Sequence, residues 1–132
     1  MIDHVSLGVS DIESSRRFYA AILAPLGFKR LVDLPGRVGF GKRYPELWLL
    51  ARPAMARVAD DTGCHVSLRS EDRAGVDAFH ATAIEKGGMC DGEPRLRAYS
   101  MANAYAAFIR DPDGNRVEAV HLMGPTQAKT NS

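Results

Sequence analysis

The chain has 132 residues, enough for one compact domain. Its hydrophobic fraction of 45% and charged fraction of 25% are those of an ordinary folded protein, which excludes a largely disordered chain. The 17 basic and 16 acidic residues leave a net charge of +1, and the basic residues are scattered. The composition therefore gives no reason to expect nucleic acid or a membrane as a partner.

Cysteine usage and the N-terminal residues both favour a cytoplasmic protein. The two cysteines, Cys64 and Cys90, are too few for a disulfide framework and are expected to be reduced thiols. The first residues lack the basic stretch and following apolar run of a signal peptide. No apolar run is long enough to span a membrane.

The sequence contains an internal repeat. A shift of 61 residues aligns residues 4–7 with residues 65–68, and both segments read His-Val-Ser-Leu. The same shift aligns four further identical pairs: Asp11 with Asp72, Phe18 with Phe79, Ala20 with Ala81, and Gly27 with Gly88. Agreement at one constant shift over this distance indicates a duplicated structural unit.

The first half begins with a predicted strand and helix. Residues 2–9 alternate between apolar and polar side chains, which is the periodicity of a strand with one buried face. Ser10 or Asp11 then offers an N-cap for a helix over residues 14–24, which Pro25 ends. Three short strand-like runs separated by turn residues follow at 28–34, 37–41 and 46–51.

The second half repeats this order. A strand over residues 63–68 precedes a helix that starts at Asp72, and strand-like runs follow near 89–96, 105–110 and 116–122. The segment Asp-Pro-Asp-Gly-Asn at 111–115 predicts a tight turn between the last two runs. Each half is thus a βαβββ unit. The prediction is an α+β fold of two tandem modules, 1–52 and 63–123, with a linker at 53–62 and a flexible tail at 124–132.

Tandem βαβββ units that each begin with a strand-borne histidine resemble the vicinal oxygen chelate superfamily. This superfamily includes glyoxalases, extradiol dioxygenases, fosfomycin-resistance proteins and bleomycin-binding proteins. The resemblance covers about residues 1–123 and rests on the segments 2–5, 10–19 and 110–118 together with His65. It implies a curled mixed sheet enclosing a cavity, as in the glyoxalase-like fold, and a homodimer.

Three candidate metal ligands follow from the alternation and from this resemblance. If Val5 and Leu7 pack under their helix, His4 points to the other sheet face, and the repeat places His65 likewise. In the last strand Val117 and Ala119 are the apolar pair for the helix side, so Glu118 between them points to the same face as the two histidines. His4, His65 and Glu118 match the metal positions of the superfamily. Two imidazoles and a carboxylate leave coordination positions open on a divalent Fe, Mn, Zn or Ni ion.

A fourth ligand is left open. The metalloglyoxalases that the chain resembles carry a second glutamate in the last strand of the first half. The only acidic residue there, Glu46, stands at the beginning of the strand, and the inward position corresponds to Leu47 or Trp48. Trp48 is predicted to form a cavity wall that stacks on substrate, with a core aromatic as the alternative.

The region before the last tight turn often lines the cavity mouth in the superfamily. By this resemblance Tyr99 is the candidate acid–base group, and Arg97 and Tyr105 are candidate substrate contacts. The remaining histidines are not expected to be ligands: His80 is predicted to face solvent, and His121 to lie on the strand face opposite Glu118.

The leading hypothesis is a small divalent-metal-dependent enzyme, of lyase, isomerase or dioxygenase type. Its small-molecule substrate would chelate the metal through vicinal oxygens. The alternative is a non-catalytic small-molecule-binding protein like the bleomycin-resistance proteins. A third possibility is a metal-bound domain that senses a metabolite for a partner protein.

Overall fold

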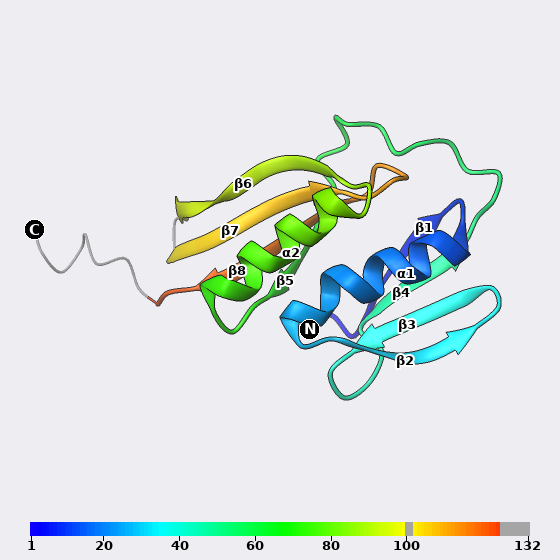
Figure 1. The fold of residues 1–132 in the computed structure, drawn as a ribbon, viewed down its shortest axis with the longest axis horizontal. Coiled ribbons are helices and arrows are strands. Elements are labelled where there is room, and N and C mark those ends of the chain that lie inside the picture. Colours follow the sequence, from blue (N-terminus) through cyan, green and yellow to red (C-terminus); the bar gives the residue numbers. More distant parts are fainter. Residues whose placement is uncertain (100–101, 125–132) are drawn as a thin grey trace, which may run out of the picture.

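Each half of the chain folds into one helix and four strands in the predicted order (Figure 1). The computed structural model describes residues 1–99 and 102–124. The elements of the first half are β1 (Val5–Val9), α1 (Ile12–Leu23), the 3-10 turn η1 (Ala24–Leu26), β2 (Lys29–Leu34), β3 (Arg37–Gly41) and β4 (Leu47–Ala51). Those of the second half are β5 (Val66–Arg69), α2 (Arg73–Glu85), β6 (Met89–Ala98), β7 (Asn103–Arg110) and β8 (Arg116–Leu122).

The strands form two four-stranded mixed sheets with one topology. Sheet A has the order β1-β4-β3-β2, and sheet B has the order β5-β8-β7-β6. In each sheet the first strand of the module runs parallel to the last, and the other neighbours are antiparallel. The predicted α+β class with two tandem βαβββ modules is confirmed.

One helix covers one face of each sheet. Val9 of β1 and Leu47 and Leu49 of β4 are fully or almost fully buried with Tyr19 and Ile22 of α1. Apolar residues of both modules belong to this one core, which explains why a chain of this length folds as a unit. The opposite face of each sheet carries no helix and is called its open face below.

The helices begin where the sequence supplies capping side chains. Asp11 is the N-cap of α1, and its carboxylate accepts hydrogen bonds from the backbone of Glu13 and Ser14. Asp72 caps α2 through the backbone N–H of Gly75. Of the two predicted caps for α1, the structure therefore uses Asp11.

The turn between β7 and β8 joins the two modules. Asp111 accepts a 2.6 Å hydrogen bond from the hydroxyl of Tyr19 in α1. The side-chain amide of Asn115 donates to the carbonyl of Gly8, and Asp113 accepts from the backbone N–H of Ser10. These buried and partly buried bonds fix the second module against the first strand and helix of the chain.

The edges β1 and β5 line a cavity of about 860 Å³ that lies between the two modules. Each of these strands pairs with a neighbour on one side only within its sheet. The predicted tail falls largely outside the described residues, because positions 125–132 are not among them. Among the described helices, neither is long and apolar enough to cross a membrane.

Candidate functional site

The open face of sheet B brings together a histidine, a glutamate and a tyrosine. Glu118 of β8 is 4% exposed, and its Oε1 lies 3.2 Å from Nε2 of His65, the residue before β5. The hydroxyl of Tyr99, which directly follows β6, donates a 2.8 Å hydrogen bond to the other carboxylate oxygen. Three of the residues predicted to form the site therefore converge.

Strand alternation and register explain this convergence. Val117 and Ala119 are buried in the core on the helix side, so Glu118 between them must point to the open face. Phe108 of β7 is its cross-strand partner, and the Phe108 ring contacts the His65 ring edge-on at 5.6 Å between centroids. Phe108 thus stands beside Glu118 on the open face and contacts the imidazole.

The buried carboxylate has few partners for its charge. Among the described residues, His65 is the only basic group within ion-pair distance of Glu118. A carboxylate removed from water without a permanent cation is unfavourable, and such a site favours a cationic ligand. Burial, together with the hydrogen bond and the negative charge of Glu118, raises the pKa of the Tyr99 hydroxyl, which stays protonated at neutral pH.

Two arginines stack on Phe108 beside this cluster. The guanidinium of Arg116 lies 4.0 Å from the ring centroid and that of Arg97 lies 5.1 Å from it. Arg116 also forms a 2.5 Å ion pair with Asp91, so its charge is neutralised. Arg97 donates only to the carbonyl oxygens of Ala106 and Glu93, and no described carboxylate lies within ion-pair distance of it.

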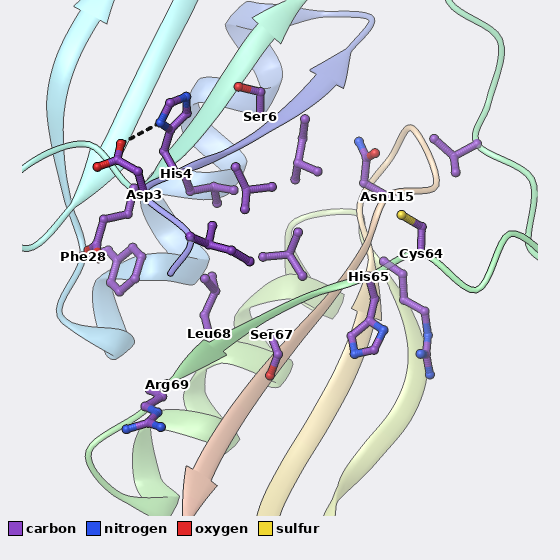
Figure 2. A pocket seen from close by; sticks show the side chains of 18 of the residues that line it. Asp3, His4, Ser6, Phe28, Cys64, His65, Ser67, Leu68, Arg69 and Asn115 are labelled. Carbon is purple, nitrogen blue, oxygen red and sulfur yellow. Dashed lines mark hydrogen bonds and ion pairs between the residues drawn. The ribbon is translucent and has the colours of Figure 1, made fainter.

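His4 directly precedes β1, the first strand of the other sheet. Its Nδ1 is 2.7 Å from a carboxylate oxygen of Asp3, an arrangement that leaves Nε2 available. Figure 2 shows His4 and His65 on opposite sides of the cavity between β1 and β5, with their rings pointing apart. Within residues 1–99 and 102–124, no group of three His, Cys, Asp or Glu side chains is close enough to hold a metal ion.

Sheet register settles which residue of β4 faces the open side. Trp48 lies opposite Ser6, and Glu118 lies opposite Ser67, the equivalent serine of the repeat. Trp48 therefore occupies in sheet A the position that Glu118 occupies in sheet B, whereas Leu47 is buried in the core. Glu46 precedes β4 and lines the cavity between the modules.

Tyr105 and His80 do not lie where the sequence analysis places them. The hydroxyl of Tyr105 donates a 2.6 Å hydrogen bond to Asp77 of α2, so the structure does not bring this predicted substrate contact to the open face of sheet B. The prediction that His80 faces solvent is wrong, because it is 9% exposed and its Nε2 has no hydrogen-bond partner among the described residues. Helical spacing groups His80 with buried Val76 and Ala83, a signal that the sequence contained.

Sequence reasoning missed Phe108, Arg116 and Asp3. Alternation could have found both strand residues. Phe108 lies between buried Ala107 and Ile109, and Arg116 is two residues from Glu118, so each side chain points to the open face. Asp3 adjoins His4 in sequence, and a carboxylate beside a strand-borne histidine is a signal for an oriented imidazole.

Comparisons with known proteins agree with the fold. The model of the Glyoxalase/Bleomycin resistance protein/Dioxygenase superfamily matches residues 1–119. A glyoxalase/bleomycin resistance protein of Albidiferax ferrireducens T118 is 31% identical, with a TM-score of 0.80 over 90% of this chain and 97% of that one.

Two further relatives are more distant. The uncharacterized protein YqjT of Bacillus subtilis (strain 168) is 27% identical over 122 residues, which are 89% of this chain and 95% of YqjT. A lactoylglutathione lyase of Agrobacterium tumefaciens is 22% identical, with a TM-score of 0.61 over 92% of each chain, and at this identity it supports the fold alone.

Proposed function

Because the chain belongs to the glyoxalase/bleomycin resistance protein/dioxygenase superfamily, we propose that it is a divalent-metal-dependent enzyme acting on a small substrate with two neighbouring oxygens. The observation that carries this proposal is the contact of His65 with the buried carboxylate of Glu118. An imidazole and a carboxylate on one rigid sheet are suitable ligands for a divalent ion.

The donor set of one chain is short by one side chain. His65 and Glu118 supply two donors, and the third candidate, His4, lies on the open face of sheet A. We propose that a second copy of the chain supplies this histidine, since a two-fold dimer can place sheet A of each copy over sheet B of the other. His65, Glu118 and the partner's His4 would then hold the ion.

Each protein group in this arrangement has a separate chemical task. A bound divalent ion would supply Lewis-acid stabilisation of the negative charge that develops on a substrate oxygen. The protonated hydroxyl of Tyr99 holds a proton at Glu118 Oε2, where it is available to a substrate oxygen. Arg97, without a carboxylate partner in the described chain, can position an anionic part of the substrate.

Divalent-metal titration tests the proposal. We expect the wild-type protein to bind one ion per site. Glu118→Gln and His65→Ala should each weaken metal binding by at least about 10- to 100-fold. His121→Ala is the matched control, because His121 sits on the helix side of the same strand and contacts the carbonyl of Ser70. Unchanged affinity in Glu118→Gln, or affinity lost equally in His121→Ala, would contradict the proposal.

Turnover assays then separate the reaction types. Oxygen uptake with catechols reports a dioxygenase, and a gain of ultraviolet absorbance, as thiol adducts of α-ketoaldehydes become thioesters, reports a glyoxalase-type isomerisation. Metal-dependent turnover in either assay that is lost in Glu118→Gln supports the enzyme. Metal binding without turnover of any such substrate argues against it.

One observation favours the alternative of a non-catalytic binding protein. Trp48, an aromatic side chain suited to stacking, stands in sheet A where a carboxylate stands in sheet B. Such a protein would bind its ligand equally well with and without metal. The enzyme requires metal for turnover, so chelation distinguishes the two functions.

A further inference from the structure

The open face of sheet A contains a second cavity, which is separate from the His65–Glu118 contact. Its volume is about 530 Å³, within the range of small-molecule sites. Trp48, Tyr44 and Arg37 line it, and the pair Asp3–His4 lies at one side. It therefore combines two aromatic side chains with one permanent cation.

Trp48 packs closely against its neighbours in this cavity. A Cβ atom on Gly39 would lie 2.9 Å from Cβ of Pro45 and 3.0 Å from Cζ3 of the indole, so the glycine makes room for the ring. The indole remains half-buried, and Tyr44 is 51% exposed. Ordered aromatic surface that stays in contact with solvent is what a flat ligand requires.

Arg37 has no acidic partner among the described residues. Its guanidinium lies 5.5 Å from the centroid of the Trp48 ring, and no described carboxylate is within ion-pair distance. Within residues 1–99 and 102–124, the only acidic side chain that lines the cavity is Asp3, whose carboxylate accepts from Nδ1 of His4. The cavity thus offers a positive charge beside a flat aromatic wall.

We propose that this cavity binds a planar aromatic carboxylate. The ring packs against Trp48 and Tyr44, and the carboxylate forms a charge-assisted pair with Arg37. The volume admits a ligand of one or two rings. This inference names the substrate class of the proposed function. It rests on the proposed function in one respect, which is that the open face of sheet A forms part of the substrate cavity.

Intrinsic fluorescence provides a direct test because Trp48 is the only tryptophan of the chain. Full-length protein in EDTA is titrated with benzoate, its neutral analogue benzamide, and the non-planar cyclohexanecarboxylate. We expect benzoate to change the tryptophan fluorescence in a saturable way. The other two probes should need concentrations at least about tenfold higher to reach the same change. Arg37→Gln should abolish the preference for benzoate over benzamide, and Arg37→Lys should retain part of it.

Arg17→Gln is the matched control, since Arg17 is exposed on α1 and does not line the cavity. The absence of saturation by benzoate overturns the inference, as does equal saturation by cyclohexanecarboxylate or identical discrimination in Arg37→Gln and Arg17→Gln. Metal is chelated throughout, so these outcomes leave the metal proposal untouched. Glu118→Gln that loses metal but binds benzoate normally supports the inference, because Glu118 does not line this cavity.

Discussion

Trp48 and Glu118 occupy equivalent positions in the two sheets, although one is a large aromatic side chain and the other a carboxylate. Each lies opposite the serine of its His-Val-Ser-Leu segment, Ser6 for Trp48 and Ser67 for Glu118. The neighbouring strand compensates for the difference in size. Gly39 pairs with the large Trp48, whereas Phe108 pairs with the smaller Glu118. The duplication thus preserves the architecture and divides aromatic and carboxylate chemistry between the two open faces.

Replacing Glu118 by glutamine should stabilise the metal-free protein. The buried carboxylate has only His65 as a basic partner among the described residues, and an imidazole is not a permanent cation. Removing the charge while keeping the shape should raise the free energy of unfolding by about 1 kcal/mol. Urea unfolding in EDTA measures this.

The exposed Glu85 provides the control, because Glu85→Gln should change the free energy by no more than about 0.5 kcal/mol. If Glu118→Gln lowers stability, the Glu118 carboxylate is a structural ion-pair partner and not a site kept for a ligand.

Gly39→Ala should displace the indole of Trp48. The added methyl group would meet Pro45 and Trp48 at about the 2.9–3.0 Å separations that require a neighbour to move. We expect a loss of about 1–3 kcal/mol in the free energy of unfolding and a shift of the tryptophan emission maximum. Gly36→Ala is the control, since nothing lies within 4 Å of a Cβ there. Equal emission spectra for the two variants would contradict the placement of the ring.

Much of this arrangement could be predicted from alternation in the strands. Because successive side chains point to opposite faces, the buried Val117 and Ala119 fixed the direction of Glu118. The same rule could have assigned Tyr105 to the helix side, since it is two residues from buried Ala107. The resemblance to cavity-lining regions, and not this local signal, was the basis for naming Tyr105 a substrate contact.

The placement of the two histidines relative to each other could not be predicted in this way. Alternation fixes the face of a sheet but not how two sheets are arranged in space. That arrangement depends on buried bonds between distant residues, such as Tyr19 with Asp111. The Arg37–Trp48 stack also joins two strands, and the Tyr44 loop has no periodicity from which a direction can be read.

Tyr19→Phe should weaken the junction between the modules. The hydroxyl of Tyr19 donates a buried hydrogen bond to Asp111, whose carboxylate also accepts from Asn115. Loss of this bond should lower the free energy of unfolding by about 1.5–3 kcal/mol at neutral pH. Chemical denaturation measures it, with the exposed Tyr44→Phe as the control. A loss no larger than that of the control would show that the bond does not hold the modules together.

Alkaline pH should destabilise the wild type more than Tyr19→Phe. Burial, followed by the nearby charge and hydrogen bond of Asp111, raises the pKa of Tyr19 well above its ordinary value of 10.0. Above a pH of 10.0 the unfolded chain releases the phenolic proton, while the folded chain retains it. Stability therefore falls as pH rises, with a contribution from this group of at most about 1.4 kcal/mol per pH unit. Unfolding curves with parallel pH dependence in both proteins would contradict this.

The most direct test of the proposed shared metal site is complementation between two defective chains. His4→Ala and His65→Ala are each assayed for divalent-metal binding alone, and then as an equimolar mixture refolded together. If the site takes His4 from one copy and His65 with Glu118 from the other, a mixed dimer contains one intact site. Random association then restores about a quarter of the wild-type binding capacity. A mixture that binds no more metal than the separate variants would contradict a site shared between two copies.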